Sequence, residues 1–340
     1  MRFGLGGYAL EQVQTHGGAV AGRDLLADAV LAEALGFDSL WVAENHFSRD
    51  RQCASPFVIA GVLAGATRRI RIGVFSILTF AHPLRVAEDA ATLDLMSGGR
   101  LMLCVGTGYR AEEFAAFGIA MQGKGARFRE CLEVVQKAWA GPFVHYGKHF
   151  RISTAVEDVP PEAGALAVLP QPLQTAIPIW MAAFGNVSVK RAARLGYPLL
   201  PAALESIPEL QAKYHLYHTA WDTGEHPAPP MPMPLMRVVY VAPRAHVAHQ
   251  EAEAGLMQTY DRYRRWGLLT NAGSTYATLA RDRFIIGDPA QVIAEIQRYR
   301  ELFGITDLIC RMAMPAVPHE HIQRSMRLFS EHVAPHFSHA

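Results

Sequence analysis

Short apolar runs alternate along the chain with longer stretches in which apolar residues recur at helical spacing. This alternation is typical of parallel strands that are joined by crossover helices. Eight runs are predicted to be strands: residues 2–5, 38–43, 70–78, 101–106, 177–183, 197–202, 236–242 and 306–312. The helices predicted between them span residues 24–35, 56–66, 84–96, 126–140, 187–195, 206–222, 246–265 and 289–303.

The number of predicted strands indicates the fold, because eight is the count of a closed (β/α)8 barrel. No change of composition argues for a second domain. We therefore predict an α/β fold, a TIM barrel formed by residues 1–340 as one domain. Two connections, residues 141–176 and 266–284, are too long for simple turns and predict insertions after strands 4 and 7. Long loops of this kind usually carry function or are mobile.

The composition narrows the class of partner. Half of the residues are apolar, and 32 basic residues are intermixed with 31 acidic ones, which gives a formal net charge of +1. Such a chain has no field that would attract nucleic acid or an anionic membrane. No apolar run approaches the roughly 18–20 residues that span a bilayer, and the N-terminal residues lack the apolar segment of a signal peptide. We expect a cytoplasmic protein that acts on a small molecule.

The second predicted strand ends in a carboxylate, an amide and an imidazole: Glu44, Asn45 and His46. In a barrel the C-terminal ends of the strands surround one mouth, where chemistry is expected. Residues two apart in a strand share a face, so Glu44 and His46 could both point inward with Asn45 opposite, or the reverse. They could form an acid/base wall, a polar rim that fixes a loop, or a metal site. The metal site is disfavoured because no second His/Asp pair follows another strand, and the four cysteines lie far apart.

The fourth predicted strand is followed by a loop that could approach a flat or anionic ligand. Gly108 allows the backbone to come close, and Thr107 precedes it. Tyr109 and Arg110 then offer an aromatic ring and a permanent cation.

The fifth predicted strand turns through Phe184 and Gly185 into a helix with Asn186 and Ser188 in its first turn. Backbone amides at a helix N-terminus form a ready phosphate site. An ordinary N-cap would explain Asn186 equally well, and would leave Gly185 and Ser188 for a ligand.

Four stretches carry a family resemblance: WVAENHF (41–47), the run from HPLRVAED to EEFAAFG (82–118), RFRECLEVVQKAW (127–139) and IPIWMAAFGNVSVKRAARLG (177–196). Together they resemble the bacterial luciferase-like family of flavin-dependent monooxygenases. The resemblance implies a (β/α)8 barrel with a flavin at its C-terminal mouth, usually in a homodimer packed through barrel helices. Members typically use reduced flavin and oxygen to oxygenate an organic substrate, and a large branch uses a deazaflavin coenzyme for hydride transfer.

The resemblance also implies where the flavin would lie. Its phosphate would meet the start of the helix after strand 5 and the loop after strand 4, and its ring would lie against the end of strand 3. A non-prolyl cis peptide is implied there, at Val74–Phe75 or Phe75–Ser76. The implied cofactor-binding residues are Val74, Phe75, Ser76, Thr107, Gly108, Tyr109, Arg110, Phe184, Gly185, Asn186 and Ser188.

This chain departs from the family pattern after strand 2. Where many relatives have Glu-His-His-Phe, it has Asn45 in place of the first histidine. An amide can hydrogen-bond a ligand but cannot exchange a proton near neutral pH, whereas His46 can. The catalytic candidates are therefore His46, Asn45 and Glu44, and luciferase-type aldehyde oxidation is in doubt.

A second departure concerns the cation for the phosphate. Thr107 stands where luciferase has an arginine, so Arg110, Lys124 or Arg127 would have to serve. A lysine binds phosphate as a point charge, without the fork of an arginine.

The resulting prediction is a monooxygenase that uses reduced FMN, supplied by a separate flavin reductase, and oxygen. The alternatives are a deazaflavin-dependent oxidoreductase of the same fold and a flavin-binding protein without turnover. Reduced flavin that has reacted with oxygen needs an apolar pocket that excludes water. Residues 266–284 are a candidate lid. Candidate lining residues are Phe47, Phe75, Phe80, Trp180 and Phe184.

Overall fold

The computed structural model describes residues 1–8, 18–48, 53–154, 164–222, 233–269, 273 and 275–337. Within these ranges, nine strands form one parallel sheet in the order β10-β9-β11-β1-β2-β3-β4-β7-β8. The strands are β1 (Arg2–Tyr8), β2 (Ser39–Ala43), β3 (Arg71–Ile77), β4 (Leu101–Gly106), β7 (Ile179–Ala183), β8 (Leu199–Pro201), β9 (Pro234–Val241), β10 (Phe284–Gly287) and β11 (Asp307–Arg311).

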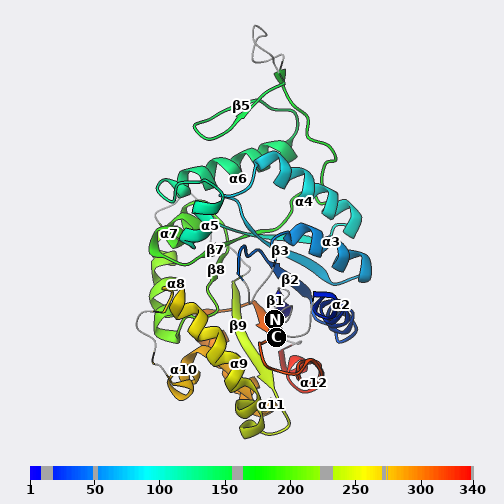
Figure 1. Ribbon diagram of the computed structural model, residues 1–340, viewed down its shortest axis with the longest axis vertical. Coiled ribbons are helices and arrows are strands. Elements are labelled where there is room, and N and C mark those ends of the chain that lie inside the picture. The colour runs from blue at the N-terminus through cyan, green and yellow to red at the C-terminus, as the bar shows by residue number, and fades with distance from the viewer. Residues whose placement is uncertain are drawn as a thin grey trace.

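The sheet curls so that its two ends approach each other (Figure 1). β8, at one end of the order, packs beside β9 near the other end. No ladder of hydrogen bonds joins β8 to β9 among the described residues, so the predicted closed barrel is found as a curled sheet. The eight predicted strands are all present, and β10 is an additional strand that pairs with the C-terminal half of β9.

Helices cover the outside of the sheet, and each of the predicted ones is confirmed. They are α2 (Gly18–Ala34), α3 (Pro56–Ala66), α4 (Pro83–Ser97), α6 (Lys124–Ala140), α7 (Asn186–Arg194), α8 (Ile207–Asp222), α9 (Ala245–Arg265) and α11 (Pro289–Phe303). The structure also contains helical segments that were not predicted: α5 (Ala111–Ala116), α10 (Tyr276–Arg283), α12 (His319–His332) and the short η2 (Ala334–Phe337).

Local signals set the ends of the predicted helices. α11 begins after Asp288, whose side chain accepts a hydrogen bond from the Gln291 amide at 3.0 Å. It ends at Gly304, whose φ of 62° gives the left-handed cap that only glycine adopts easily. α4 begins with Pro83 and ends at Gly98 in the same left-handed conformation.

The two long connections contain structure of their own. Between β4 and β7 the chain forms α5, α6 and an antiparallel hairpin of β5 (His145–Tyr146) and β6 (Arg151–Ile152). This hairpin extends beyond the helical layer at the top of Figure 1. Between β9 and β11 lie α9, α10, β10 and α11. The candidate lid at 266–284 lies partly outside the described residues, and α10 fills most of its C-terminal part.

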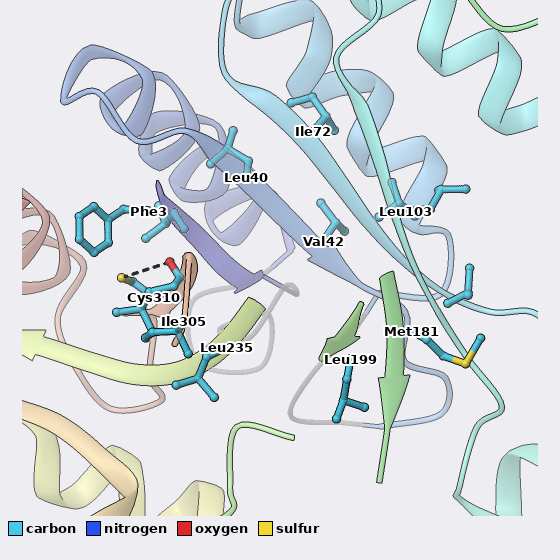
Figure 2. Close-up of a cluster of buried hydrophobic side chains, with 14 of the residues drawn as sticks. Phe3, Leu40, Val42, Ile72, Leu103, Met181, Leu199, Leu235, Ile305 and Cys310 are labelled. Carbon is cyan, nitrogen blue, oxygen red and sulfur yellow. Dashed lines mark hydrogen bonds between the residues drawn. The ribbon is translucent and has the colours of Figure 1, made fainter. Parts of the chain in front are cut away.

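Two sets of buried side chains pack on opposite faces of the sheet. The larger set fills the space between the sheet and the helices, and Figure 2 shows part of it, including Leu40, Val42 and Leu103. The smaller set lies on the concave face and consists of Trp41, Met102, Cys104, Trp180, Leu200 and Ile309. Neighbouring residues along β2 and β4 belong to different sets, as the two-residue period of a strand requires.

A pair of tryptophans dominates the concave face. The rings of Trp41 and Trp180 stack with centroids 4.7 Å apart, and both side chains are buried. Gly73 makes room for the first of them, because a Cβ at this position would lie 2.2 Å from the Trp41 ring. The strand ends beyond this pair are therefore supported by a filled interior.

In the part of the chain that is described, no helix combines the length and the apolar composition needed to cross a bilayer.

Candidate active site

The residues that follow β2 continue along the sheet edge. The Glu44 amide donates to the Phe75 carbonyl on β3 at 3.2 Å, one step beyond the last paired residue of β2. The Asn45 amide then donates to the Cys53 carbonyl at 2.9 Å. The segment is thus fixed on both sides and presents its side chains at the carboxyl ends of the strands.

Glu44 and His46 share one face, as the two-residue period of an extended segment predicts. Glu44 Oε1 lies 2.7 Å from His46 Nε2, and both side chains are about nine-tenths buried. Glu44 Oε2 accepts hydrogen bonds from the Ile77 amide at 2.7 Å and from the Ser76 hydroxyl at 3.2 Å. A carboxylate at Nε2 favours the tautomer with its proton there, which leaves Nδ1 as the basic nitrogen.

Asn45 lies between them in sequence and is 7% exposed. Its side-chain oxygen Oδ1 is buried and has no hydrogen-bond partner among the residues that the structure describes. An unpaired buried acceptor costs roughly 1–3 kcal/mol, so a bound molecule with an N–H or O–H group would find a ready acceptor here.

A buried ion pair holds the backbone of His46. Glu113 Oε1 accepts from the His46 amide at 3.1 Å, and Arg110 Nη1 donates to the His46 carbonyl at 2.6 Å. The two side chains also pair with each other at 3.1 Å. Burial raises the pKa of Glu113, against the lowering effects of the His46 amide and Arg110. The Arg110 guanidinium lies 4.5 Å from the centre of the Trp266 ring.

Aromatic rings surround the exposed side of His46. The Phe117 ring meets the imidazole edge to face at 4.8 Å and stacks on Phe80 at 4.8 Å. Phe114 contacts Phe80 at 4.8 Å. Phe47 is 64% exposed and has a φ of 53°, an unusual conformation for a large side chain. The imidazole therefore lies among apolar groups.

The predicted lining residues fall into three places. Phe47 and Phe80 lie beside His46. Phe75 and Trp180 instead pack with the Trp41 cluster on the concave face. Phe184 packs against Tyr109, with ring centres 5.3 Å apart.

The loop after β4 is fixed by hydrogen bonds to its carbonyl groups. Lys124 Nζ donates to the Gly108 carbonyl at 2.8 Å, and the Thr79 hydroxyl donates to the Thr107 carbonyl at 3.0 Å. Gly108 has a φ of 70°, and a Cβ there would lie 3.0 Å from the Ile77 side chain. Glycine is therefore needed for the loop to pack closely.

Each of the three cations predicted as a partner of the phosphate donates a hydrogen bond to a backbone carbonyl. Arg110 binds the His46 carbonyl, Lys124 binds the Gly108 carbonyl, and Arg127 Nε binds the Thr79 carbonyl at 2.9 Å. The hydrogen bond of Arg110 to the His46 carbonyl ties it to the end of β2, whereas its neighbour Tyr109 packs against Phe184.

The turn between β7 and α7 presents a row of amides. Gly185 is the N-cap of α7, so the reading of Asn186 as the N-cap is wrong, and Asn186 is the first helical residue. The Ser188 amide donates back to the Gly185 carbonyl at 2.9 Å. Among the described residues, the amides at 184–187 donate to no carbonyl, and nothing lies within 4 Å of a Cβ built on Gly185. Such a turn can bind an anion.

The expectation of a non-prolyl cis peptide in strand 3 is wrong. In the described chain the cis bond is Leu169–Pro170, and the bonds on both sides of Phe75 are trans. β3 pairs with β4 residue by residue from Ile72 to Ile77, and this regular ladder accommodates trans peptides. Of the three residues predicted on this strand, Ser76 reaches Glu44, whereas Val74 is buried in the outer core.

Two residues at the site were missed from the sequence. Glu113 lies 67 positions from His46 along the chain, and in the sequence it is one of two adjacent acids in a short helix. Trp266 follows α9 directly and meets both Arg110 and Arg262. The sequence signal for Glu113 was its spacing from Arg110, because residues three apart can form an ion pair on a helix.

Comparison with known proteins identifies relatives of the chain. It is 29% identical over 338 residues to the 4-hydroxyprotoasukamycin monooxygenase of Streptomyces nodosus subsp. asukaensis, covering 93% of this chain and 88% of that relative. It is 33% identical over 184 residues to the uncharacterized protein y4vJ of Sinorhizobium fredii, where the match covers 54% of this chain and half of that relative.

Solved structures share the architecture. The monooxygenase RslO1 from Streptomyces bottropensis superposes with a TM-score of 0.85 at 27% identity, covering 99% of this chain and 100% of that one. The oxygenating constituent of 3,6-diketocamphane monooxygenase from Pseudomonas putida, in complex with FMN, gives 0.83 at 20% identity and covers 98% of each chain. An F420-dependent secondary alcohol dehydrogenase gives 0.76 at 19% identity, also covering 98% of each. The last two show a shared fold.

The family model described as luciferase-like monooxygenase matches residues 1–306. The chain therefore belongs to the luciferase-like monooxygenase family.

Proposed function

We propose that the protein is a cytoplasmic flavin-dependent monooxygenase that uses reduced FMN and oxygen to oxygenate a small organic substrate. The observation that carries the proposal is the buried Glu44–His46 pair, set among aromatic rings at the carboxyl ends of the strands. Reduced flavin, when bound, supplies the activation of oxygen and the transfer of one oxygen atom. The monooxygenases named among its relatives agree with this reaction class.

The residues present fit a flavin phosphate. The amides at 184–187 lack carbonyl acceptors in the described chain, and they stand at the positive end of the α7 dipole. Ser188 adds a hydroxyl in the first turn of the helix. Neutral amides and a hydroxyl suit a phosphate dianion, and the contact between Tyr109 and Phe184 places the Thr107–Gly108 loop beside this turn.

His46 is the residue we assign to proton transfer. Glu44 holds Nε2, so Nδ1 is free to take or give a proton on the side of the bound substrate. Asn45 contributes a buried acceptor, Oδ1, that would orient a hydrogen-bond donor of the bound molecule. The aromatic rings around His46 exclude water from the site.

Anaerobic titration with chemically reduced FMN, followed by rapid mixing with oxygen, tests the proposal. We expect saturable binding, and reoxidation slower than that of free reduced FMN, because the site shields the flavin from water. In His46→Gln the reoxidation rate should change by about tenfold or more, since one general acid or base contributes about 10²–10⁴. Reoxidation identical to that of free reduced FMN would contradict the proposal.

Two other functions use the same site. A deazaflavin coenzyme also carries a phosphate, and the F420-dependent alcohol dehydrogenase shares the fold. Titration with reduced deazaflavin beside reduced FMN separates them by affinity. A flavin-binding protein without turnover would retain reduced FMN and couple no substrate to oxygen use.

We also propose two protein partners. A separate flavin reductase would supply reduced FMN, because the sequence has no nicotinamide-binding fingerprint of its own. A second copy of the chain would pack against α3. This helix has no charged residue, and it exposes Val58 and Val62 one turn apart, with 68% and 53% of their surface accessible.

A further inference from the structure

A buried ammonium lies behind the turn between β7 and α7. Lys213, on α8, is 7% exposed. Its Nζ donates to the Ala183 carbonyl at 3.1 Å and to the Phe184 carbonyl at 2.8 Å. Its remaining partner is Glu205, in the turn between β8 and α8. An ammonium has three N–H donors, so the group is fully used.

These contacts fix the direction of two peptide groups. In a planar trans peptide the carbonyl and the following N–H point in opposite directions. Because Lys213 draws the carbonyls of Ala183 and Phe184 toward itself, the amides of Phe184 and Gly185 must point away from it. Neither amide donates to a carbonyl in the described part of the chain. Lys213 thus orients half of the row of amides at 184–187.

We propose that Lys213 is a positioning residue for the coenzyme phosphate: it orients the amides of Phe184 and Gly185 without touching the ligand. The inference rests on the proposed function, in which these amides bind the phosphate of a flavin. Glu205 neutralises the buried ammonium and ties the turn to the neighbouring β8–α8 turn. The positive charge of Lys213 is therefore paired with Glu205 behind the turn, apart from the charge of the bound phosphate.

Comparison of FMN with riboflavin isolates the phosphate. Riboflavin has the same ring system and lacks the phosphate, so the ratio of the two dissociation constants measures what the amides contribute. We expect the wild-type protein to bind reduced FMN at least about tenfold more tightly than reduced riboflavin, since hydrogen bonds to a charged group are strong. Anaerobic fluorescence titration gives both constants.

The test variant is Lys213→Met with Glu205→Gln, which removes the buried pair without leaving one charge alone. The affinity for reduced FMN should fall about tenfold, and that for reduced riboflavin should stay within about twofold. Glu205→Gln alone is the matched control, because it keeps the ammonium and both carbonyl contacts, and it should retain the preference for FMN. Lys213→Arg tests the same point in case the double variant does not fold, since a guanidinium fork cannot reproduce the three contacts of one nitrogen.

The outcomes separate the two proposals. Equal wild-type affinity for FMN and riboflavin would overturn the phosphate site, and this inference with it. A wild-type preference that persists in the double variant, or in Lys213→Arg, would overturn the role of Lys213 alone. A loss of both affinities in parallel would show a general structural role and would overturn the positioning role as well.

Discussion

At the scale of single residues, the backbone of His46 is held by a buried ion pair. Glu113 accepts a hydrogen bond from the His46 amide, and Arg110 donates one to the His46 carbonyl. The next residue, Phe47, has a left-handed φ of 53°. A left-handed conformation costs a large residue about 1–2 kcal/mol. The pair of hydrogen bonds fixes the His46 backbone immediately before this bend.

We predict that Arg110→Met makes the free energy of unfolding depend more strongly on pH through Glu113. Burial already raises the pKa of this carboxyl above its ordinary value of 4.5, and Arg110 opposes the shift. Without Arg110, folded Glu113 keeps its proton to higher pH than the unfolded chain does. The free energy of unfolding, relative to wild type, should therefore fall as pH rises above 4.5. Urea unfolding at a series of pH values measures it.

The control for this prediction is the double variant Arg110→Met with Glu113→Gln. A glutamine does not titrate but can still accept from the His46 amide, so the difference from wild type should lose most of its added pH dependence. Parallel pH profiles for wild type and Arg110→Met would show that Arg110 does not stabilise the charged form of Glu113.

The sequence predicts some of these residue contacts and misses others for a physical reason. Glu44 and His46 are two apart in an extended segment, so the strand period alone allowed their contact. The partner of the His46 amide is 67 positions away, and only the packing of α5 against the β2 end brings it there. The position of Arg110 beside Trp266 likewise depends on tertiary structure.

At the scale of elements, the concave face of the sheet is filled by large rings opposite glycines. Gly73 on β3 faces Trp41, whose indole is fully buried and hydrogen-bonded to the Ser39 hydroxyl at 2.9 Å. The Trp41 ring also stacks on Trp180, so it has little freedom to move. The side chains of β2, β3 and β7 therefore fit closely together around the Trp41 ring.

We predict that Gly73→Ala lowers the free energy of unfolding by about 1–3 kcal/mol, the usual cost of overpacking a core. The new Cβ would lie 2.2 Å from Trp41. Gly22→Ala on α2 is the matched control, because nothing lies within 4 Å of its Cβ and alanine favours a helix by up to about 1 kcal/mol. Equal stability of the two variants in urea would contradict a rigid fit around Trp41.

The elements that the sequence could predict are those with a clear hydrophobic periodicity and recognisable helix-capping residues. α4 and α11 both begin with proline and end at glycine, and each was predicted within one residue at both ends. β10 has only four residues and α10 contains a non-helical residue, Asp282, so neither is long or regular enough for its periodicity to be recognised in the sequence. α12 is long enough to be predicted, and its apolar spacing in SMRLFSEH was the overlooked signal.

At the scale of the whole molecule, the strand count predicted a closed barrel, and the described residues form a curled parallel sheet of nine strands with helices outside (Figure 1). The order from β1 to β8 follows the chain, and β11 returns beside β1, as right-handed crossovers lead one to expect. The sequence could not show that β9 would pair with both β11 and β10. That pairing depends on which strands lie next to β9 in the folded chain, because β8 is only three residues long.

The surface of α3 leads to the last prediction, which concerns assembly. α3 packs beside α4 and presents Val58 and Val62 outward from a helix without charge. Each buried valine contributes about 1.5–3 kcal/mol, and 1.4 kcal/mol is a factor of ten in affinity. Val58→Asp with Val62→Asp should therefore weaken a dimer by at least about hundredfold. Size-exclusion chromatography with light scattering should find a dimer for wild type and a monomer for this variant.

The control is Leu302→Asp on α11, which changes a partly exposed apolar residue on another helix and should remain dimeric. A monomeric wild type, or a dimer that survives the α3 changes, would remove α3 as the interface.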